Sequence, residues 1–186
     1  PTERLLAKRV EGVAIDFSSI AKGYGVDLGA DALDELGVTD YLLEVGGEIR
    51  VRGESPRGDR WRIAIERPLE GDARDVQAAV AVTDIGIATS GDYRNFFEVD
   101  GVRYSHLLDP RTGRPIRHDL VSVTVVHPAT AIADAWATAL IVLGYDAARA
   151  LADEQQLAVY FVRHQNDGFG VEWTEPMASY LVTDER

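Results

Sequence analysis

The chain has 186 residues and a formal net charge of −12 at pH 7, and 46% of its residues are hydrophobic and 27% charged. These values fit about one globular domain and exclude a disordered or collagen-like chain, and the negative charge disfavours nucleic-acid binding because the protein's own field repels a polyanion. The absence of cysteine excludes disulfides and thiolate chemistry, and no apolar run approaches the roughly 18 residues of a membrane span.

The first predicted element is a strand over the weakly alternating segment Val10–Phe17. A helix is predicted from Ser18 to about Leu36, with Ser18 and Ser19 as N-caps and Gly37 as its end. Its larger apolar side chains share one face: Ile20, Tyr24, Leu28, Ala32 and Leu36. Three glycines inside this helix each cost about 1 kcal/mol relative to alanine, so we expect a close neighbour at its first turn.

Short strands follow this helix. Tyr41–Val45 and Ile49–Val51 flank the pair Gly46-Gly47, which is typical of a turn. Arg60–Ile65 is predicted to pair with Ile49–Val51 across a polar loop, and Gln77–Val82 is predicted as a further strand.

The next segment contains the clearest hairpin pattern of the sequence. Arg94–Val99 and Val102–Leu108 flank Asp100-Gly101, a dipeptide that favours a type I′ turn. Asp109–Gly113 predicts a tight turn, because Pro110 presets the backbone at its second position.

The last third of the chain alternates strands and helices. The predicted elements are a strand Val121–Val126, a helix Ala131–Leu143 ended by Gly144, a helix Asp146–Gln155 and paired strands Leu157–Val162 and Gly168–Trp173. Mixed elements, several hairpins and the lack of a repeat or linker predict one α+β domain over residues 1–186, with a mostly antiparallel sheet and packed helices.

Three groups of residues are candidates for chemistry, and the first lies where the helix begins. Asp16, Ser18 and Ser19 precede Lys22, which with Lys8 makes up the only two lysines of the chain. Unpaired N–H groups at a helix N-terminus attract anions, so this segment predicts an anion site. The alternative is a well-capped helix with a surface lysine.

The second group is Asp134 and Thr138, which lie one turn apart on an otherwise apolar helix. Their two oxygens suit a hard divalent cation. The alternative is an exposed helix face whose threonine bonds back to a carbonyl.

The third group combines Ala88–Tyr93 with Tyr104–Gly113. Small hydroxyl residues beside glycine allow close approach of a ligand, and His106 is a candidate acid or base near neutral pH. The alternative for His106 is a structural histidine, and the other three histidines show no metal-ligand spacing.

Taken together, these segments closely resemble the ApbE family of flavin transferases. The matching motifs are DFSSIAKGYGVD (16–27), EVGGEI (44–49), WRIAI (61–65), ATSGDY (88–93), YSHLLDPRTG (104–113) and ADAWATALIVLG (133–144). The resemblance implies an ApbE-like, T-fold-like architecture and an enzyme that binds FAD with Mg²⁺. Such an enzyme transfers FMN from FAD to a Thr or Ser hydroxyl of a target protein and releases AMP.

The resemblance also implies roles for individual residues. Asp134, the Thr138 hydroxyl and the Ser19 backbone carbonyl would ligate Mg²⁺. Asp16, Lys22 and the main chain at Leu108 would contact FAD, and His106 together with Asp134 would be catalytic. Such a division suits phosphoryl transfer, in which catalysis is mostly positioning and electrostatic stabilisation.

The resemblance covers residues from about 10 to 165, and members of the family usually carry a long further segment before that point. We therefore expect this chain to be the C-terminal part of an ApbE-type domain. Its location, cytoplasmic or in the cell envelope, stays open. Two alternatives to transfer remain: a flavin-binding fragment without transferase activity, and a pyrophosphatase that cuts FAD to FMN and AMP.

Overall fold

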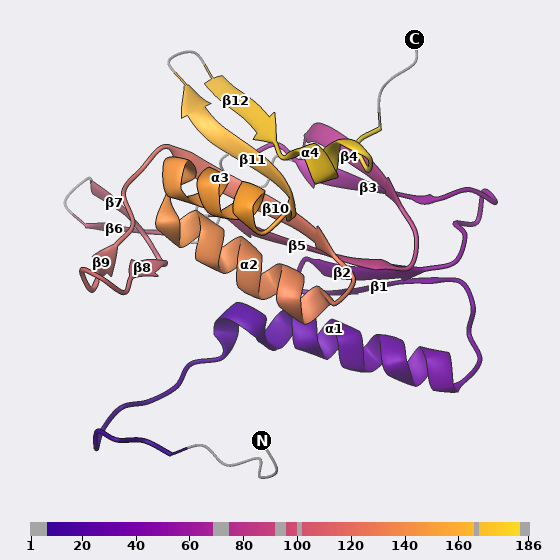
Figure 1. Ribbon diagram of the computed structural model, residues 1–186, viewed down its shortest axis with the longest axis horizontal. Coiled ribbons are helices and arrows are strands. Elements are labelled where there is room, and N and C mark those ends of the chain that lie inside the picture. Colours follow the sequence, from indigo (N-terminus) through magenta and orange to yellow (C-terminus); the bar gives the residue numbers. More distant parts are fainter. Residues whose placement is uncertain (1–6, 69–74, 92–95, 100–101, 166–167, 183–186) are drawn as a thin grey trace.

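A computed structural model describes residues 7–68, 75–91, 96–99, 102–165 and 168–182. Its centre is a six-stranded sheet in the order β1-β2-β5-β10-β11-β12, in which all neighbours run antiparallel (Figure 1). The strands are β1 Tyr41–Val45, β2 Glu48–Arg52, β5 Ile85–Gly91, β10 Leu120–His127, β11 Ala158–Gln165 and β12 Gly168–Trp173. The predicted α+β class with a mostly antiparallel sheet is confirmed.

The helices are α1 Ser18–Glu35, α2 Thr130–Leu143, α3 Tyr145–Glu154 and α4 Glu175–Ala178. The ribbons outside the main sheet pair β3 Trp61–Glu66 with β4 Val76–Val82, β6 Phe96–Val99 with β7 Val102–Ser105, and β8 Leu108–Asp109 with β9 Arg114–Pro115. Helices α2 and α3 cover one face of the main sheet, the β3–β4 ribbon and α4 cover the other, and the small ribbons β6–β7 and β8–β9 lie to one side of it (Figure 1). None of the helices in the described part of the chain is long and apolar enough to cross a membrane.

Two apolar clusters lie on either side of the sheet, and β10 contributes to both. Val123 and Val125 point to the cluster beneath α2 and α3, whereas Val126 points to the cluster beneath the β3–β4 ribbon and α4. A strand buried on both faces reads as a continuous apolar run, which explains the LVSVTVV sequence of β10. Residues of α2 share the first of these clusters with β5 and β10, so α2 packs directly on the sheet.

The predicted strand Val10–Phe17 is wrong. Residues 13–17 form neither a strand nor a helix and run away from the sheet (Figure 1), and their apolar side chains are largely exposed. Alternation favours a strand only where a partner strand buries one face of it. In the described residues, the edge strand β1 pairs with β2 alone.

The predicted helix at Ser18 is confirmed as α1, but its caps and its buried face differ from the prediction. Its N-cap is Phe17 rather than a serine. The residues that α1 buries are Gly23, Val26 and Ala30, while Tyr24 and Leu28 of the predicted face are more than half exposed. The buried face of α1 carries small residues because they let this helix approach α2 and β1 closely.

Two pairings also differ from the predictions. β3 pairs with β4 and not with β2, whose neighbours are β1 and β5. β5 is a central strand that we did not predict, because IGIATSG is poor in the large apolar residues that mark a strand. Cross-strand Thr89 and Thr124 compensate with a hydroxyl–hydroxyl hydrogen bond of 2.8 Å between β5 and β10.

The other hairpins and turns agree with the sequence. β6 pairs with β7, and β11 pairs with β12, although the turn residues Asp100-Gly101 and Asn166-Asp167 lie outside the described residues. The tight turn at Asp109 is confirmed: its carbonyl accepts the N–H groups of Thr112 and Gly113 at 3.1 and 2.7 Å. This turn closes the β8–β9 ribbon beside α2.

Candidate functional site at the crossing of α1 and α2

The candidate site is built around a point where α1 and α2 touch backbone to backbone. A Cβ atom at Gly23 of α1 would lie 2.5 Å from the Thr130 carbonyl oxygen and 2.8 Å from the Ala131 Cα. No larger residue fits at these distances. The start of α2 is therefore the close neighbour that the glycines of α1 predicted. The contact brings the first turns of α1 onto the side of α2 that carries Asp134.

Asp134 is the carboxylate that α2 brings to this crossing. It is only 2% exposed, and its Oδ2 accepts the backbone N–H of Gly23 at 3.0 Å. Burial raises the pKa of the Asp134 carboxyl, and the Gly23 N–H and the Lys22 charge oppose that rise. Burying a carboxylate is costly, and buried carboxylates with a perturbed pKa cluster at functional sites, so Asp134 marks this crossing as a candidate site.

Lys22 approaches the same crossing from α1. Its Nζ lies 2.5 Å from Oε1 of Glu48, the first residue of β2, whose side chain is 1% exposed. Burial raises the pKa of the Glu48 carboxyl, while its hydrogen bond and charge interaction with Lys22 lower it and the Asp134 charge adds to the rise. Glu48 lies inside the EVGGEI motif, but neither the sequence pattern nor the family resemblance predicts a role for it.

Asp27 ties the two helices together one turn further along α1. Its carboxylate oxygens accept the N–H groups of Thr130 and Ala131, both at 2.9 Å. These N–H groups are free donors at the start of α2, so an aspartate from another helix caps α2 in place of its own N-cap residue. The cap fixes the register of Asp134 relative to Gly23.

Thr138 lies one turn after Asp134 on α2 and faces β5. Its Oγ1 is 3.1 Å from the Oγ of Ser90, a residue of the small-hydroxyl segment singled out in the sequence. Asp92 and Tyr93 of that segment lie outside the described residues. The pair Thr138–Ser90 therefore adds two hydroxyl oxygens to the side of α2 that carries Asp134.

Ser19 belongs to the same corner because of helix geometry. In an α-helix the carbonyl of residue i points at the N–H of residue i+4, so the Ser19 carbonyl points toward the Gly23 N–H that Asp134 accepts. Among the described residues no group of three or more His, Cys, Asp or Glu is arranged to hold a metal. A metal at this corner would therefore rely on one carboxylate and uncharged oxygens, a donor set that suits a hard cation with retained waters.

The other predicted residues lie around this corner. Asp16 precedes α1, where its Oδ1 accepts the Ser18 N–H at 2.7 Å, and hydrogen bonds from Ser18 lower the pKa of its carboxyl. His106 is exposed just beyond the end of β7. Leu108 is 56% exposed on β8, the short strand that packs beside α2.

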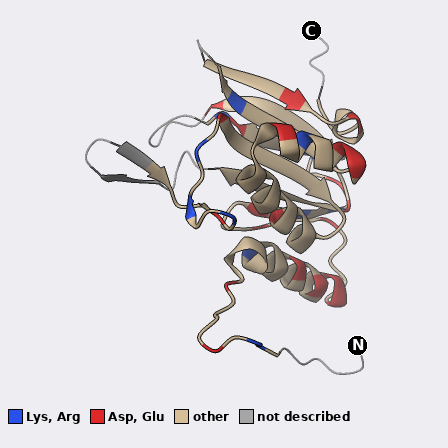
Figure 2. Ribbon diagram, turned by 60° about the vertical axis from the view of Figure 1, so that its left-hand side comes forward, with Lys and Arg blue, Asp and Glu red and all other residues tan. Residues whose placement is uncertain are grey.

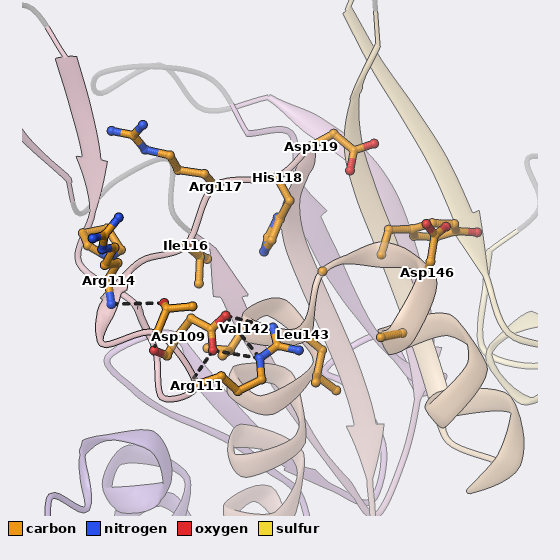
Figure 3. A pocket seen from close by; sticks show the side chains of 15 residues that line it. Asp109, Arg111, Arg114, Ile116, Arg117, His118, Asp119, Val142, Leu143 and Asp146 are labelled. Atoms are coloured by element: carbon orange, nitrogen blue, oxygen red, sulfur yellow. Dashed lines mark hydrogen bonds and ion pairs between the residues drawn. The ribbon is translucent and has the colours of Figure 1, made fainter.

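A groove of about 550 Å³ opens on the far side of β8, between the Asp109 turn and the start of α3 (Figure 3). His118 points into it, and both of its ring nitrogens are buried without a hydrogen-bond partner. The lining includes Arg111 and Arg114 but none of the residues at the α1–α2 crossing. The groove is thus a neighbour of the candidate site and not part of it.

Carboxylates follow the candidate site along the rest of α1. Figure 2 shows acidic residues along α1, where Asp27, Asp31, Asp34 and Glu35 follow one another. Such a surface repels phosphate groups, so a phosphate ligand needs a local cation and helix N–H groups to bind. Lys22 is the cation that the crossing supplies.

The chain is similar to known flavin transferases over most of its length. The model of the ApbE family matches residues 2–161. A Vibrio cholerae protein named FAD:protein FMN transferase is 49% identical over 164 residues, which are 88% of this chain and 49% of that protein. A Haemophilus influenzae protein of the same name is 45% identical over 180 residues, 97% of this chain and 52% of that protein.

Solved structures agree with these sequence matches. The apo form of the flavinyl transferase ApbE from Pseudomonas stutzeri superposes with a TM-score of 0.76 at 47% identity, over 88% of this chain and 50% of that one. The flavin transferase ApbE from Vibrio cholerae gives a TM-score of 0.79 at 43% identity, over 90% and 52%. The chain spans about half the length of the curated relatives it matches.

Proposed function

The chain belongs to the ApbE family, and on that premise we propose that it carries the catalytic residues of an FAD:protein FMN transferase. The oxygen of a Thr or Ser hydroxyl on a target protein attacks the FMN phosphorus of FAD. A new phosphoester bond forms, the phosphoanhydride bond to AMP breaks, and the hydroxyl proton leaves the acceptor. The names of the relatives support flavin transfer to protein.

The α1–α2 crossing is proposed to hold the pyrophosphate. Lys22 and the N-terminal N–H groups of α1 would stabilise the charge on the phosphate oxygens, an arrangement that a chain of net charge −12 needs. Asp16 and the Leu108 main chain would also contact FAD. The support is the convergence of one exposed cation and one buried carboxylate on the same point of α1.

Mg²⁺ is proposed to bind at Asp134, the Thr138 hydroxyl and the Ser19 carbonyl. The residues present fit the ion, because Asp134 is a buried carboxylate and the Thr138 hydroxyl and the Ser19 carbonyl are hard oxygen donors. When bound, Mg²⁺ withdraws negative charge from the pyrophosphate. The Gly23 N–H holds the Asp134 carboxylate in place, and the Ser90 hydroxyl orients Thr138.

His106 is proposed to accept the proton of the attacking hydroxyl. It is exposed beyond the end of β7, so an acceptor segment of another protein can reach it, and an imidazole can take a proton near neutral pH. Leu108, two residues further on, would keep FAD within reach of the same strand end.

The observation that carries the proposal is Asp134, buried at 2% exposure and held by the Gly23 N–H at 3.0 Å. The test incubates the chain with FAD, Mg²⁺ and a protein carrying an acceptor threonine, and measures AMP and covalent flavin. AMP with covalent flavin on the acceptor is the expected result. AMP with free FMN would make the chain a pyrophosphatase, and bound but intact FAD would make it a flavin-binding fragment.

Two variants locate the site in the same assay. Asp134→Ala removes the buried carboxylate and is expected to abolish transfer, whereas Asp31→Ala on the exposed side of α1 is expected to retain it. Unchanged turnover in Asp134→Ala would refute the assignment. Equal losses in both variants would indicate a general effect on the packing of α1 against α2 rather than a role for Asp134.

A further inference from the structure

We propose that Glu48 is a positioning residue of this site: it fixes the Lys22 ammonium at the α1–α2 crossing, where the ammonium meets the FAD pyrophosphate. The inference rests on the proposed function and adds a residue that the family motifs did not assign.

The first observation is the burial of Glu48. Its side chain is 1% exposed, Oε1 takes the Lys22 ammonium at 2.5 Å, and Oε2 is buried without a partner. Strand residues alternate between two faces, so a glutamate at this inward position displaces an apolar side chain from the interior. Burying a carboxylate with one oxygen unsatisfied is unfavourable for folding, which argues that the residue is there for its charge.

The second observation is the opening that the β1–β2 turn leaves for Lys22. Gly46 and Gly47 have φ angles of +61° and +99°, the pair of positive values that a type I′ turn requires. A Cβ atom at Gly46 would lie 3.0 Å from the Lys22 Cδ and 3.9 Å from Oε2 of Glu48. The turn is therefore shaped around the lysine stem, which crosses it to reach Glu48.

The third observation is the exposure of Lys22, whose side chain is 45% exposed although its partner is buried. An ammonium has three N–H donors, and one of them meets Glu48. The donors left over can meet phosphate oxygens. Glu48 thus anchors the ammonium from the protein side and leaves its outer side open to a ligand.

Lys22 needs such an anchor for two physical reasons. A cation near a helix N-terminus is disfavoured by the helix dipole, and the Glu48 carboxylate offsets that repulsion. A lysine stem is also flexible, and fixing it before the substrate arrives removes an entropic cost from the reaction. With both carboxyls ionised, Glu48, Lys22 and Asp134 together carry one net negative charge, which favours a site that also binds a cation.

The first arm of the test is a double-mutant cycle with Glu48→Gln and Lys22→Met, read as kcat and KM for FAD in the transfer assay. Glu48→Gln keeps the size of the side chain but loses its charge, and is expected to lower kcat/KM at least about tenfold, since small misplacements have such effects. Once Lys22→Met is present, Glu48→Gln should cost less than about twofold more. Fully additive losses would refute the proposal, because Glu48 would then act without Lys22.

The control is Glu44→Gln, which makes the same substitution on the exposed side of the same hairpin. It is expected to leave kcat/KM unchanged. If Glu48→Gln fails to fold by circular dichroism, Glu48→Asp replaces it, because it keeps the charge but withdraws it from Lys22 by one methylene. Wild-type kcat/KM in Glu48→Asp would also refute positioning.

The second arm does not depend on flavin chemistry. Lys8 and Lys22 are the only lysines, so acylation of the intact chain by an amine-reactive ester, read by mass spectrometry of peptides, compares the two directly. Lys22 is expected to react several-fold more slowly than the exposed Lys8, and to approach the rate of Lys8 in Glu48→Gln. Equal Lys22 rates in the wild type and Glu48→Gln would overturn the proposal. Slow Lys22 labelling in a chain that fails to transfer FMN would instead refute the proposed function alone.

Discussion

Replacing Gly23 with alanine tests the helix crossing on which the candidate site depends. The added methyl group would lie 2.5 Å from the Thr130 carbonyl oxygen and 2.8 Å from both the Ala131 Cα and the Asp134 Cβ. Two of these atoms belong to the α2 backbone, so no side-chain rotation relieves the overlap and the helices must separate.

The expected loss of stability follows from three contributions. Overpacking of this kind costs about 1–3 kcal/mol. Separation also weakens the Gly23–Asp134 hydrogen bond, and a bond to a charged group is worth about 1.5–3 kcal/mol. The better helix propensity of alanine returns about 1 kcal/mol. We expect Gly23→Ala to lower the free energy of unfolding by about 2 kcal/mol, and Tm by about 4–8 °C for a chain of this size.

Gly25→Ala is the matched control, because it lies in the same helix with no atom within 4 Å of an added Cβ. There only the propensity gain acts, and we expect stability to rise by up to about 1 kcal/mol. Urea unfolding followed by circular dichroism measures both variants. If Gly23→Ala were as stable as Gly25→Ala, the close contact between α1 and α2 would be refuted.

Three further predictions concern the same corner. Asp27→Ala removes the two hydrogen bonds that cap α2, and should lower the free energy of unfolding by about 2 kcal/mol, whereas Asp31→Ala should change it by no more than about 0.5 kcal/mol. The raised pKa of Asp134 implies that its stabilising contribution is full below the ordinary carboxyl pKa and is lost as pH rises through the raised value. Asp134→Asn should therefore gain stability relative to wild type as pH rises above the ordinary carboxyl pKa of about 4 in denaturant titrations, and a difference that does not change with pH would contradict the burial argument. Thr138→Val should raise the Mg²⁺ concentration needed for half-maximal transfer, while Thr138→Ser keeps the hydroxyl and the wild-type requirement; equal shifts in both would exclude the hydroxyl as a ligand.

Local sequence patterns predict many of the helices, strands and turns of this fold. β10 and β11 are apolar runs, α2 and α3 have helical periodicity, and the Asp109 turn has its proline and glycine in the right places. These preferences depend on residues that are close in the chain, so they can be predicted without knowing the tertiary contacts. The glycines of α1 likewise predicted a close neighbour, but they did not indicate that this neighbour is α2.

The candidate site could be predicted in part for the same reason. Asp134 and Thr138 lie one turn apart on one helix, and their spacing alone pairs them. Asp16 and Ser19 flank the start of α1, which their sequence positions also indicate. Their proposed roles came from the resemblance to a family and still await the experiments above.

Tertiary structure decided everything that joins distant segments. The Gly23–Asp134 hydrogen bond spans 111 residues, the Asp27 cap of α2 spans 103, and the Lys22–Glu48 pair spans 26. The partner of β3, the central place of β5 and the buried face of α1 were equally beyond local patterns. A side chain's preference for a strand or a face is set by what packs against it, and for α1 the close approach of α2 outweighed the larger apolar residues on its other side.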